Sequence, residues 1–273
     1  MTKQKTNKTI FAVIDLANNE KDQTNVAKYA AEFAKAFGLD LVLYAKQDGK
    51  VPIFTFRKAI DAAKKIPGLQ VFITKKKINL FSIYASIHDI ATQKHAAFII
   101  MGMDNKSAFS LGKTIWSITN KTIIPTILLP KNSSFVPYKN ITIAVDNERK
   151  LQKLDTALIL SRAFGSRINI FTENSADPLH RFLFRNSVDY AMDYLTKHNV
   201  SYTKTDAKKT KNFPKHLCKF SAKRSDVLII EVDPGKTSII VKQNIGTLLN
   251  IETYVQPIIF TKTRPTGLPQ KTR

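Results

Sequence analysis

Short apolar runs alternate along this chain with longer segments in which apolar residues recur at helical spacing. Residues 9–15, which are rich in β-branched and aromatic side chains, predict a strand that is buried on both faces. In residues 21–37 the apolar positions are three or four apart, as in an amphipathic helix, and Gly38 ends this helix. Strands that alternate with helices favour right-handed β-α-β crossovers, so the sequence predicts a parallel sheet.

The same alternation continues to residue 129, and Pro67 and Gly68 mark one clear stop between a helix and a strand. Residues 131–139 contain Pro137 and two serines, show no regular periodicity, and are interpreted as a linker. The further elements predicted before this linker are strands at 39–45, 69–74, 97–101 and 125–129 and helices at 54–66, 78–95 and 112–121.

After the linker the pattern restarts. Residues 140–146 mirror the first strand, so Asp146 corresponds to Asp15, and a helix at 151–164 is again followed by a glycine, Gly165. We therefore expect an α/β chain with two doubly wound domains in tandem. The domains are expected at 1–132 and 139–262 with a tail at 263–273, and the remaining elements are strands at 167–171, 200–205, 226–230 and 257–261 and a helix at 179–198.

Positive charge is the strongest feature of the composition, because 43 lysines and arginines against 21 aspartates and glutamates give a formal net charge of +22. Such a charge attracts polyanions, among them nucleic acids and anionic lipid surfaces. The lysines are spread along the whole chain, however, and neither zinc-finger spacing nor an RNP-type aromatic motif accompanies them. We interpret the charge as a solvated surface and keep association with nucleic acid as an alternative.

Residue types that carry catalysis, metal binding or membrane insertion show no organised pattern. Cys218 is the only cysteine and is expected to be buried and inert, the five histidines lack metal-ligand spacing, and no Gly-x-Ser-x-Gly motif occurs. No apolar run approaches the ~20 residues that cross a bilayer, and residues 1–8 do not resemble a signal peptide. We expect a cytoplasmic, non-catalytic protein without a metal or membrane insertion, and slow hydrolysis of ATP stays open.

Features in both halves of the chain resemble the universal stress protein (UspA-like) family. The first predicted strand ends in Asp15, and a helix with small residues follows it. Residues 96–102 are similar to the family's ADLIVMG strand, and residues 124–129 are similar to its closing CPVLVV. The resemblance is good over residues 8–130 and weaker over residues 139–261.

The resemblance implies, for each half, a five-stranded parallel sheet with helices on both faces. It also implies that the halves pair with each other, since single-domain members commonly dimerise through the last strand, and a homodimer of the whole chain stays open. Some members bind ATP through a motif written G-x2-G-x9-G-(S/T), with the aspartate after the first strand near the adenine. Glycines let the backbone approach phosphates, and a helix N-terminus supplies N–H groups to them.

The first half keeps part of this motif. Gly102 opens it, Asn105 stands where the second glycine should be, and Gly112 is followed by Lys113 and Thr114. Gly112 also keeps the family's spacing of thirteen residues to the closing proline. The loop is three residues short, and Lys113 replaces a serine or threonine, but both Lys113 and Thr114 could contact a phosphate.

Ordinary structural roles stay open for the same residues. Asp15 and Asp146 could cap a turn or the following helix, and the segment around Gly112 could be a plain turn before a helix. Two Gly-Lys-Thr triplets, at Gly112 and Gly235, are not interpreted as Walker A loops, because the glycine required five residues earlier is absent from both.

The second half departs further from the motif. Glu231 follows its fourth predicted strand where the first half has a glycine, and Asn244 stands thirteen residues before the closing Pro257. Carboxylates at Glu231 and Asp233 would repel a phosphate. We therefore expect no nucleotide in the second domain.

Taken with the resemblance, these patterns predict a tandem universal stress protein with a regulatory or stress-response role. ATP or a related adenine nucleotide would bind its first domain, with Asp15 near the adenine. The alternatives are an interaction scaffold of the same fold without a ligand, and a basic protein associated with nucleic acid.

Overall fold

One sheet runs through the whole protein. The computed structural model describes residues 8–15, 20–47, 53–77, 83–103, 121–145, 152–173, 177–207, 213–232 and 256–262. The strands of the first half are β1 (Thr9–Asp15), β2 (Asp40–Gln47), β3 (Val71–Lys77), β4 (Ala96–Gly102) and β5 (Thr126–Leu129). Those of the second half are β6 (Asn140–Val145), β7 (Arg167–Glu173), β8 (Tyr202–Ala207), β9 (Val227–Val232) and β10 (Ile258–Lys262).

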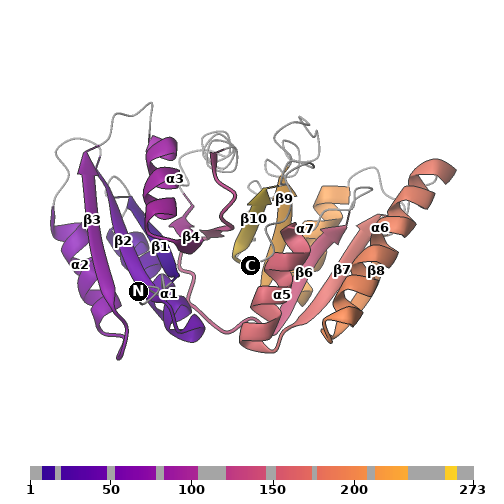
Figure 1. Ribbon diagram of the computed structural model, residues 1–273, viewed down its shortest axis with the longest axis horizontal. Coiled ribbons are helices and arrows are strands. Elements are labelled where there is room, and N and C mark those ends of the chain that lie inside the picture. Colours follow the sequence, from indigo (N-terminus) through magenta and orange to yellow (C-terminus); the bar gives the residue numbers. More distant parts are fainter. Residues whose placement is uncertain are drawn as a thin grey trace, which may run out of the picture.

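The strand order across the sheet is β3-β2-β1-β4-β5-β10-β9-β6-β7-β8 (Figure 1). Neighbouring strands are parallel, apart from β5 and β10, which pair antiparallel in the middle of the sheet. Each half contributes five strands in the same relative order, and the halves meet at their last strands, as the resemblance implied. The predicted α/β fold with a mostly parallel sheet is confirmed.

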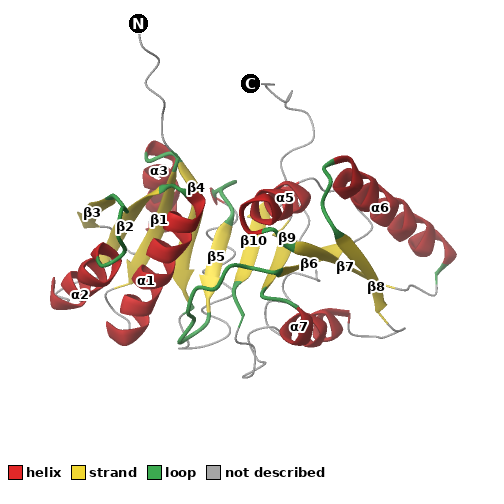
Figure 2. Ribbon diagram, turned by 90° about the horizontal axis from the view of Figure 1, so that it is seen from below, coloured by secondary structure: helices red, strands yellow, loops and turns green. Residues whose placement is uncertain are grey.

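Helices cover both faces of the sheet. They are α1 (Glu20–Phe37), α2 (Ile53–Lys64) and α3 (Ile83–Gln93) in the first half, and α5 (Gln152–Phe164), α6 (Pro178–Lys197) and α7 (Phe213–Arg224) in the second. In the second half α5 and α6 lie on one side of the strands and α7 lies on the other (Figure 2). In the first half α1 and α2 likewise lie opposite α3, as expected for a doubly wound fold.

Local sequence explains how α1 ends. Gly38 adopts a φ of +62°, in the left-handed region where glycine carries no steric penalty. The N–H of Leu39 donates to the carbonyl of Ala34 at 2.9 Å, which closes the helix in the manner of a Schellman motif. Gly165 repeats this role after α5 with a φ of +67°. The two glycines therefore mark equivalent points of the two halves.

The helix α7 was missed in the sequence. Phe213, Leu217 and Phe220 do recur at helical spacing, but they are few and are diluted by the many basic residues between them. Pro214, which argues against a helix interior, is tolerated here because it lies in the first turn.

Two boundaries in the first half also differ from prediction. α3 ends at Gln93 rather than at residue 95, because His95 has a φ of 51° in the left-handed region. β3 continues to Lys77 rather than ending at residue 74, since an edge strand tolerates lysines. Parts of two predicted helices, residues 78–82 and 112–120, lie outside the described residues.

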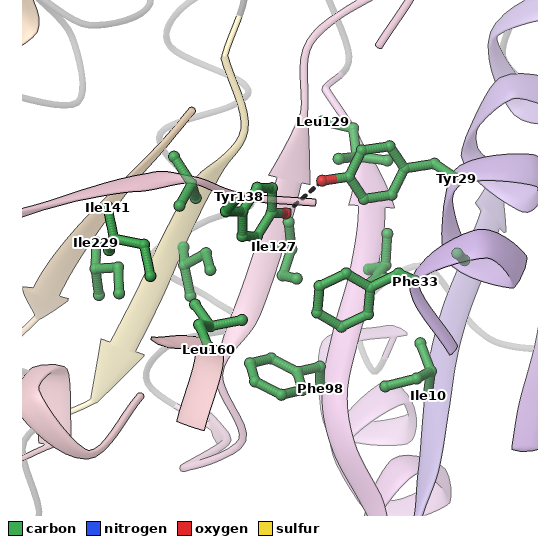
Figure 3. Close-up of a cluster of buried hydrophobic side chains, with 14 of the residues drawn as sticks. Ile10, Tyr29, Phe33, Phe98, Ile127, Leu129, Tyr138, Ile141, Leu160 and Ile229 are labelled. Atoms are coloured by element: carbon green, nitrogen blue, oxygen red, sulfur yellow. Dashed lines mark hydrogen bonds between the residues drawn. The ribbon is translucent and has the colours of Figure 1, made fainter. Parts of the chain in front are cut away.

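The hydrophobic layer beneath α1, α2, α5 and α6 is shared by the two halves (Figure 3). The ring of Phe33 on α1 lies 5.4 Å from that of Phe98 on β4. The same ring lies 5.9 Å from that of Phe164 at the end of α5. Aromatic contacts therefore join the first helix of one half to the first helix of the other.

The segment between β5 and β6 packs into this shared layer. Tyr138 is 2% exposed, and its hydroxyl forms a hydrogen bond with that of Tyr29 on α1 (Figure 3). The ring of Phe135 lies edge-on to that of Tyr29, with centroids 5.4 Å apart. The predicted linker at 131–139 is therefore irregular in backbone but anchored in the core. The division into domains at 1–132 and 139–262 stays a prediction.

Candidate functional site

The carboxyl ends of β1 and β4 lie side by side where the strand order reverses. The chain leaves β1 for β2 on one side and returns to β4 on the other side. Val13 is in register with Met101, so Asp15 and Gly102 are brought to the same edge of the sheet. Open parallel sheets bind ligands in the crevice beyond such a reversal.

Gln23 ties this edge to the start of α1. Its side chain is 3% exposed, and its Oε1 accepts a hydrogen bond from the backbone N–H of Asp15 at 2.8 Å. This bond fixes the backbone of Asp15, which is partly exposed at the carboxyl end of β1. Sequence analysis missed Gln23; the available signal was a polar residue on the same helical face as Val26 and Ala27.

Gly102 allows a close approach between β4 and α1. A Cβ atom at this position would lie 3.0 Å from Cγ2 of Val26 and 3.9 Å from Nε2 of Gln23. The first distance is shorter than an ordinary carbon–carbon contact, so a side chain here would push α1 away from the sheet. Packing of α1 on β4 therefore accounts for this glycine, because Val26 occupies the space beside it.

Asp15 and Gly102 are the only two of the six predicted site residues that fall within the described residues, and the structure brings them together. Asn105, Gly112, Lys113 and Thr114 lie outside the described residues, so their predicted contacts with phosphate stay predictions.

Tyr44 on β2 lies on the α3 side of the same region. Its ring stacks on that of Phe11 at 5.5 Å, and its buried hydroxyl forms no hydrogen bond with any described residue. Burial raises the pKa of Tyr44 to about 12, so the hydroxyl stays neutral at physiological pH. This side chain therefore contributes bulk rather than charge to the layer next to the crevice.

The equivalent position in the second half is occupied by a carboxylate. Ile143 is in register with Ile229, so Glu231 stands level with Val145, just as Gly102 stands level with Ile14. Glu231 is 8% exposed. The position that carries no side chain in the first half thus carries a buried carboxylate in the second.

That carboxylate contacts the beginning of α5. Oε2 of Glu231 accepts a hydrogen bond from the backbone N–H of Lys153 at 3.3 Å. Lys153 is 2% exposed and corresponds to Val26, since each lies twelve residues before the glycine that follows its helix. The carboxylate of Glu231 therefore accepts from an N–H group near a helix N-terminus, and such N–H groups can otherwise bind an anion. Asp146, Asp233 and Asn244 lie outside the described residues.

Among the described residues no three histidine, cysteine, aspartate or glutamate side chains gather closely enough to hold a metal ion. Cys218 is buried, as predicted, and burial raises the pKa of its thiol to about 12, so the thiol stays protonated. Within the same residues, every helix is too short or too polar to cross a bilayer.

Neither a protein-family model nor a curated protein sequence matches the chain. Its fold, however, is similar to that of a universal stress protein from Archaeoglobus fulgidus, with a TM-score of 0.62 and 11% identity over 95% of this chain and 97% of that one. A candidate universal stress protein from Pseudomonas aeruginosa is similar with a TM-score of 0.64 and 12% identity over 94% of each chain.

A third solved structure, the cytoplasmic domain of a prokaryotic cation chloride cotransporter, is similar with a TM-score of 0.53 and 11% identity over 93% of this chain and 95% of that one. At such identities a structural likeness establishes the fold alone. The chain thus has a UspA-like fold along almost its whole length.

Proposed function

We propose that this protein is a non-catalytic regulatory or stress-response protein that binds an adenine nucleotide, in the first instance ATP, in its first half. The proposal includes two tandem domains, of which the second binds no nucleotide. The UspA-like fold supports the class of protein. The crevice at the end of β1 and β4 supports the location of the ligand.

One contrast carries this proposal. At the reversal of strand order the first half has Gly102, and the equivalent position of the second half has the buried carboxylate of Glu231. A carboxylate would repel a nucleotide phosphate, whereas a glycine brings no such charge. Gly102 also begins the partial motif that continues through Gly112, Lys113 and Thr114.

The electrostatics of the chain favour the same ligand. A net charge of +22 raises the local concentration of anions such as ATP. Asp15, placed at the crevice by the bond from its N–H to Gln23, would accept a hydrogen bond from the adenine amino group. Lys113 would supply a positive charge to the phosphates.

Calorimetric titration of ATP into the wild type, Asp15→Ala and Asp146→Ala tests the proposal. The two aspartates end equivalent strands, so Asp146→Ala is the matched control in the half that is expected to bind nothing. We expect micromolar binding to the wild type and to Asp146→Ala, and a loss of about tenfold or more in Asp15→Ala. Absence of heat with millimolar ATP would overturn the proposal.

A ligand-free interaction scaffold is the second candidate, and the incomplete motif favours it. Asn105 replaces a glycine and the loop is three residues short, so the phosphate contacts of the resemblance are incomplete. Gly112→Val helps to separate the candidates, because a branched side chain would block the approach of the backbone to a phosphate. A scaffold that acts without a ligand should not depend on this approach. Unchanged ATP binding in Gly112→Val would place the ligand elsewhere.

A further inference from the structure

The two outer strands, β3 and β8, are the free edges of the sheet in the part of the chain that the structure describes. There, β3 is hydrogen-bonded to β2 alone and β8 to β7 alone. Each strand presents a row of backbone N–H and C=O groups to which a further strand could be added. Edge strands commonly carry polar or charged features that oppose such addition.

Strand register shows which residues of the two edges correspond. Phe72 on β3 is level with Phe11 on β1, and Thr203 on β8 is level with Thr142 on β6. Phe11 and Thr142 lie four residues before Asp15 and Asp146 respectively, so Phe72 corresponds to Thr203. By the same register Ile73 corresponds to Lys204. The two edges can therefore be compared position by position.

The edge at β8 is polar. The hydroxyl of Thr203 donates to Oδ1 of Asn169 on the neighbouring strand at 2.6 Å. The ammonium of Lys204 lies 3.1 Å from a carboxylate oxygen of Asp206 on the same strand. These side chains bond among themselves and offer no apolar contact to an added strand.

The edge at β3 is apolar at the corresponding positions. Phe72 is 48% exposed and Ile73 is 44% exposed. Their partners in register, Val42 and Leu43, belong to the layers on opposite faces of the sheet, so Phe72 and Ile73 also lie on opposite faces. The helices on both faces thus leave the same edge partly uncovered.

Positive charge adjoins these two apolar side chains. The strand continues directly into Lys75, Lys76 and Lys77. A segment that docks along β3 would therefore meet apolar contacts first and cations at the carboxyl end of the strand.

We propose that β3 is a docking edge for an extended acidic segment of a partner protein, which adds to the sheet as a further strand. The ladder of hydrogen bonds would come from the outer backbone groups of β3. Phe72 and Ile73 would each pack against an alternate side chain of the added strand, one on each face of the sheet. The positive net charge of the chain would favour its carboxylates.

Charge and geometry favour this occupant over others. A second copy of the chain would bring a net charge of +22 against another +22, which opposes association. A phosphate surface, whether of a lipid or a nucleic acid, would use the lysines but could not cover two apolar side chains on opposite faces of one strand. An acidic peptide strand satisfies the backbone edge, both apolar side chains and the charge.

Fluorescence anisotropy with the full chain and a labelled peptide of about ten residues tests the proposal. In this peptide two adjacent valines, which lie on opposite faces of a strand, are flanked by glutamates. The variant Phe72→Thr/Ile73→Lys gives β3 the residues of β8 at equivalent positions. We expect its affinity for the peptide to fall about tenfold or more relative to the wild type. Leu179→Thr/Phe182→Thr removes two exposed apolar side chains from α6 and is expected to bind as the wild type does.

Two further peptides separate strand addition from attraction of charge. Methylation of alternate backbone nitrogens removes the donors that would face β3, so the methylated peptide should bind at least about tenfold more weakly. A peptide with lysines in place of the glutamates should not bind. The proposal would be overturned if the wild type bound the methylated and unmethylated peptides equally well, or if the Phe72→Thr/Ile73→Lys variant bound the acidic peptide as tightly as the wild type does. Absence of binding of the acidic peptide at about 1 mM would also overturn it.

Discussion

In the first half of the sheet Gly102 lies against Val26 of α1, whereas in the second half Glu231 bonds to the backbone of Lys153 on α5. The strand order around these pairs is the same, so the backbone fold does not account for the difference. At the end of the fourth strand the first half has an apolar contact without charge, and the second half has a buried carboxylate. One fold can thus place groups of different charge at the same position of its two halves.

Both halves nevertheless depend on a common core, and the largest predicted effect concerns it. Phe33 and Leu160 are equivalent residues of α1 and α5, and both are fully buried. We expect Phe33→Ala to lower the free energy of unfolding by about 3–5 kcal/mol and Leu160→Ala by about 2–5 kcal/mol. Because the core is shared, urea unfolding followed by circular dichroism should show one transition in each variant.

The control for this prediction is Phe182→Ala. The side chain of Phe182 is 60% exposed and should contribute little to the free energy of unfolding. Two separate transitions, with only one of them shifted by Phe33→Ala, would show that the halves unfold independently. That outcome would contradict the shared core as a source of cooperativity.

The close contact at Gly102 predicts a smaller effect. Gly102→Ala places a Cβ 3.0 Å from Val26, and we expect a loss of about 1–3 kcal/mol in the free energy of unfolding. Val26→Ala removes the opposing methyl groups, so the double variant should be less destabilised than the sum of the two single variants. Additive losses in urea unfolding would show that the two residues do not compete for space.

Between the halves, the pair Tyr29 and Tyr138 predicts a dependence on alkaline pH. Burial, with the neighbouring Tyr138, raises the pKa of Tyr29 well above its ordinary value of 10.0, and burial likewise raises the pKa of Tyr138. The unfolded chain therefore loses these protons near pH 10 while the folded chain keeps them. The contribution of these two hydroxyls to stability should be constant below about pH 9 and decline as the pH rises further.

Urea midpoints measured from about pH 8 to pH 11 would check this dependence. Tyr29→Phe/Tyr138→Phe should show a shallower decline, though not a flat one, because burial also raises the pKa of Tyr44, Tyr194 and Cys218. An identical slope in the wild type and the double variant would contradict the account.

The smallest predicted effect belongs to Tyr44. Its buried hydroxyl forms no hydrogen bond with any described residue, so Tyr44→Phe should change the free energy of unfolding by less than about 0.5 kcal/mol or raise it slightly. Tyr138→Phe, which leaves the hydroxyl of Tyr29 without its partner, should cost about 1 kcal/mol or more. Thermal melts of the two variants provide the comparison, and an equal loss in both would be the contrary result.

Much of this arrangement is visible in the sequence because it depends on local periodicity. The restart at residue 140, with Gly165 repeating the role of Gly38, predicts two runs of the same elements. The helix α7 is not predicted from the sequence, because its apolar residues are few. Long-range contacts leave no such local pattern: nothing near Tyr138 in the sequence indicates that it bonds to Tyr29, 109 residues away.

The candidate site likewise has residues that can be predicted from local sequence and contacts that cannot. Asp15 and Gly102 are recognisable from their positions at strand ends, and Glu231 is recognisable by comparison with Gly102. The bond from Glu231 to the N–H of Lys153 and the role of Gln23 depend on how a helix sits over the sheet, which periodicity does not reveal.

The stoichiometry of ATP binding, measured by calorimetry on the full wild-type chain, tests the contrast between the halves most directly. The account predicts one ATP per chain, because the first half has Gly102 where the second half has the carboxylate of Glu231. Two ATP molecules per chain would show that Glu231 does not exclude phosphate, and none would overturn nucleotide binding in the first half.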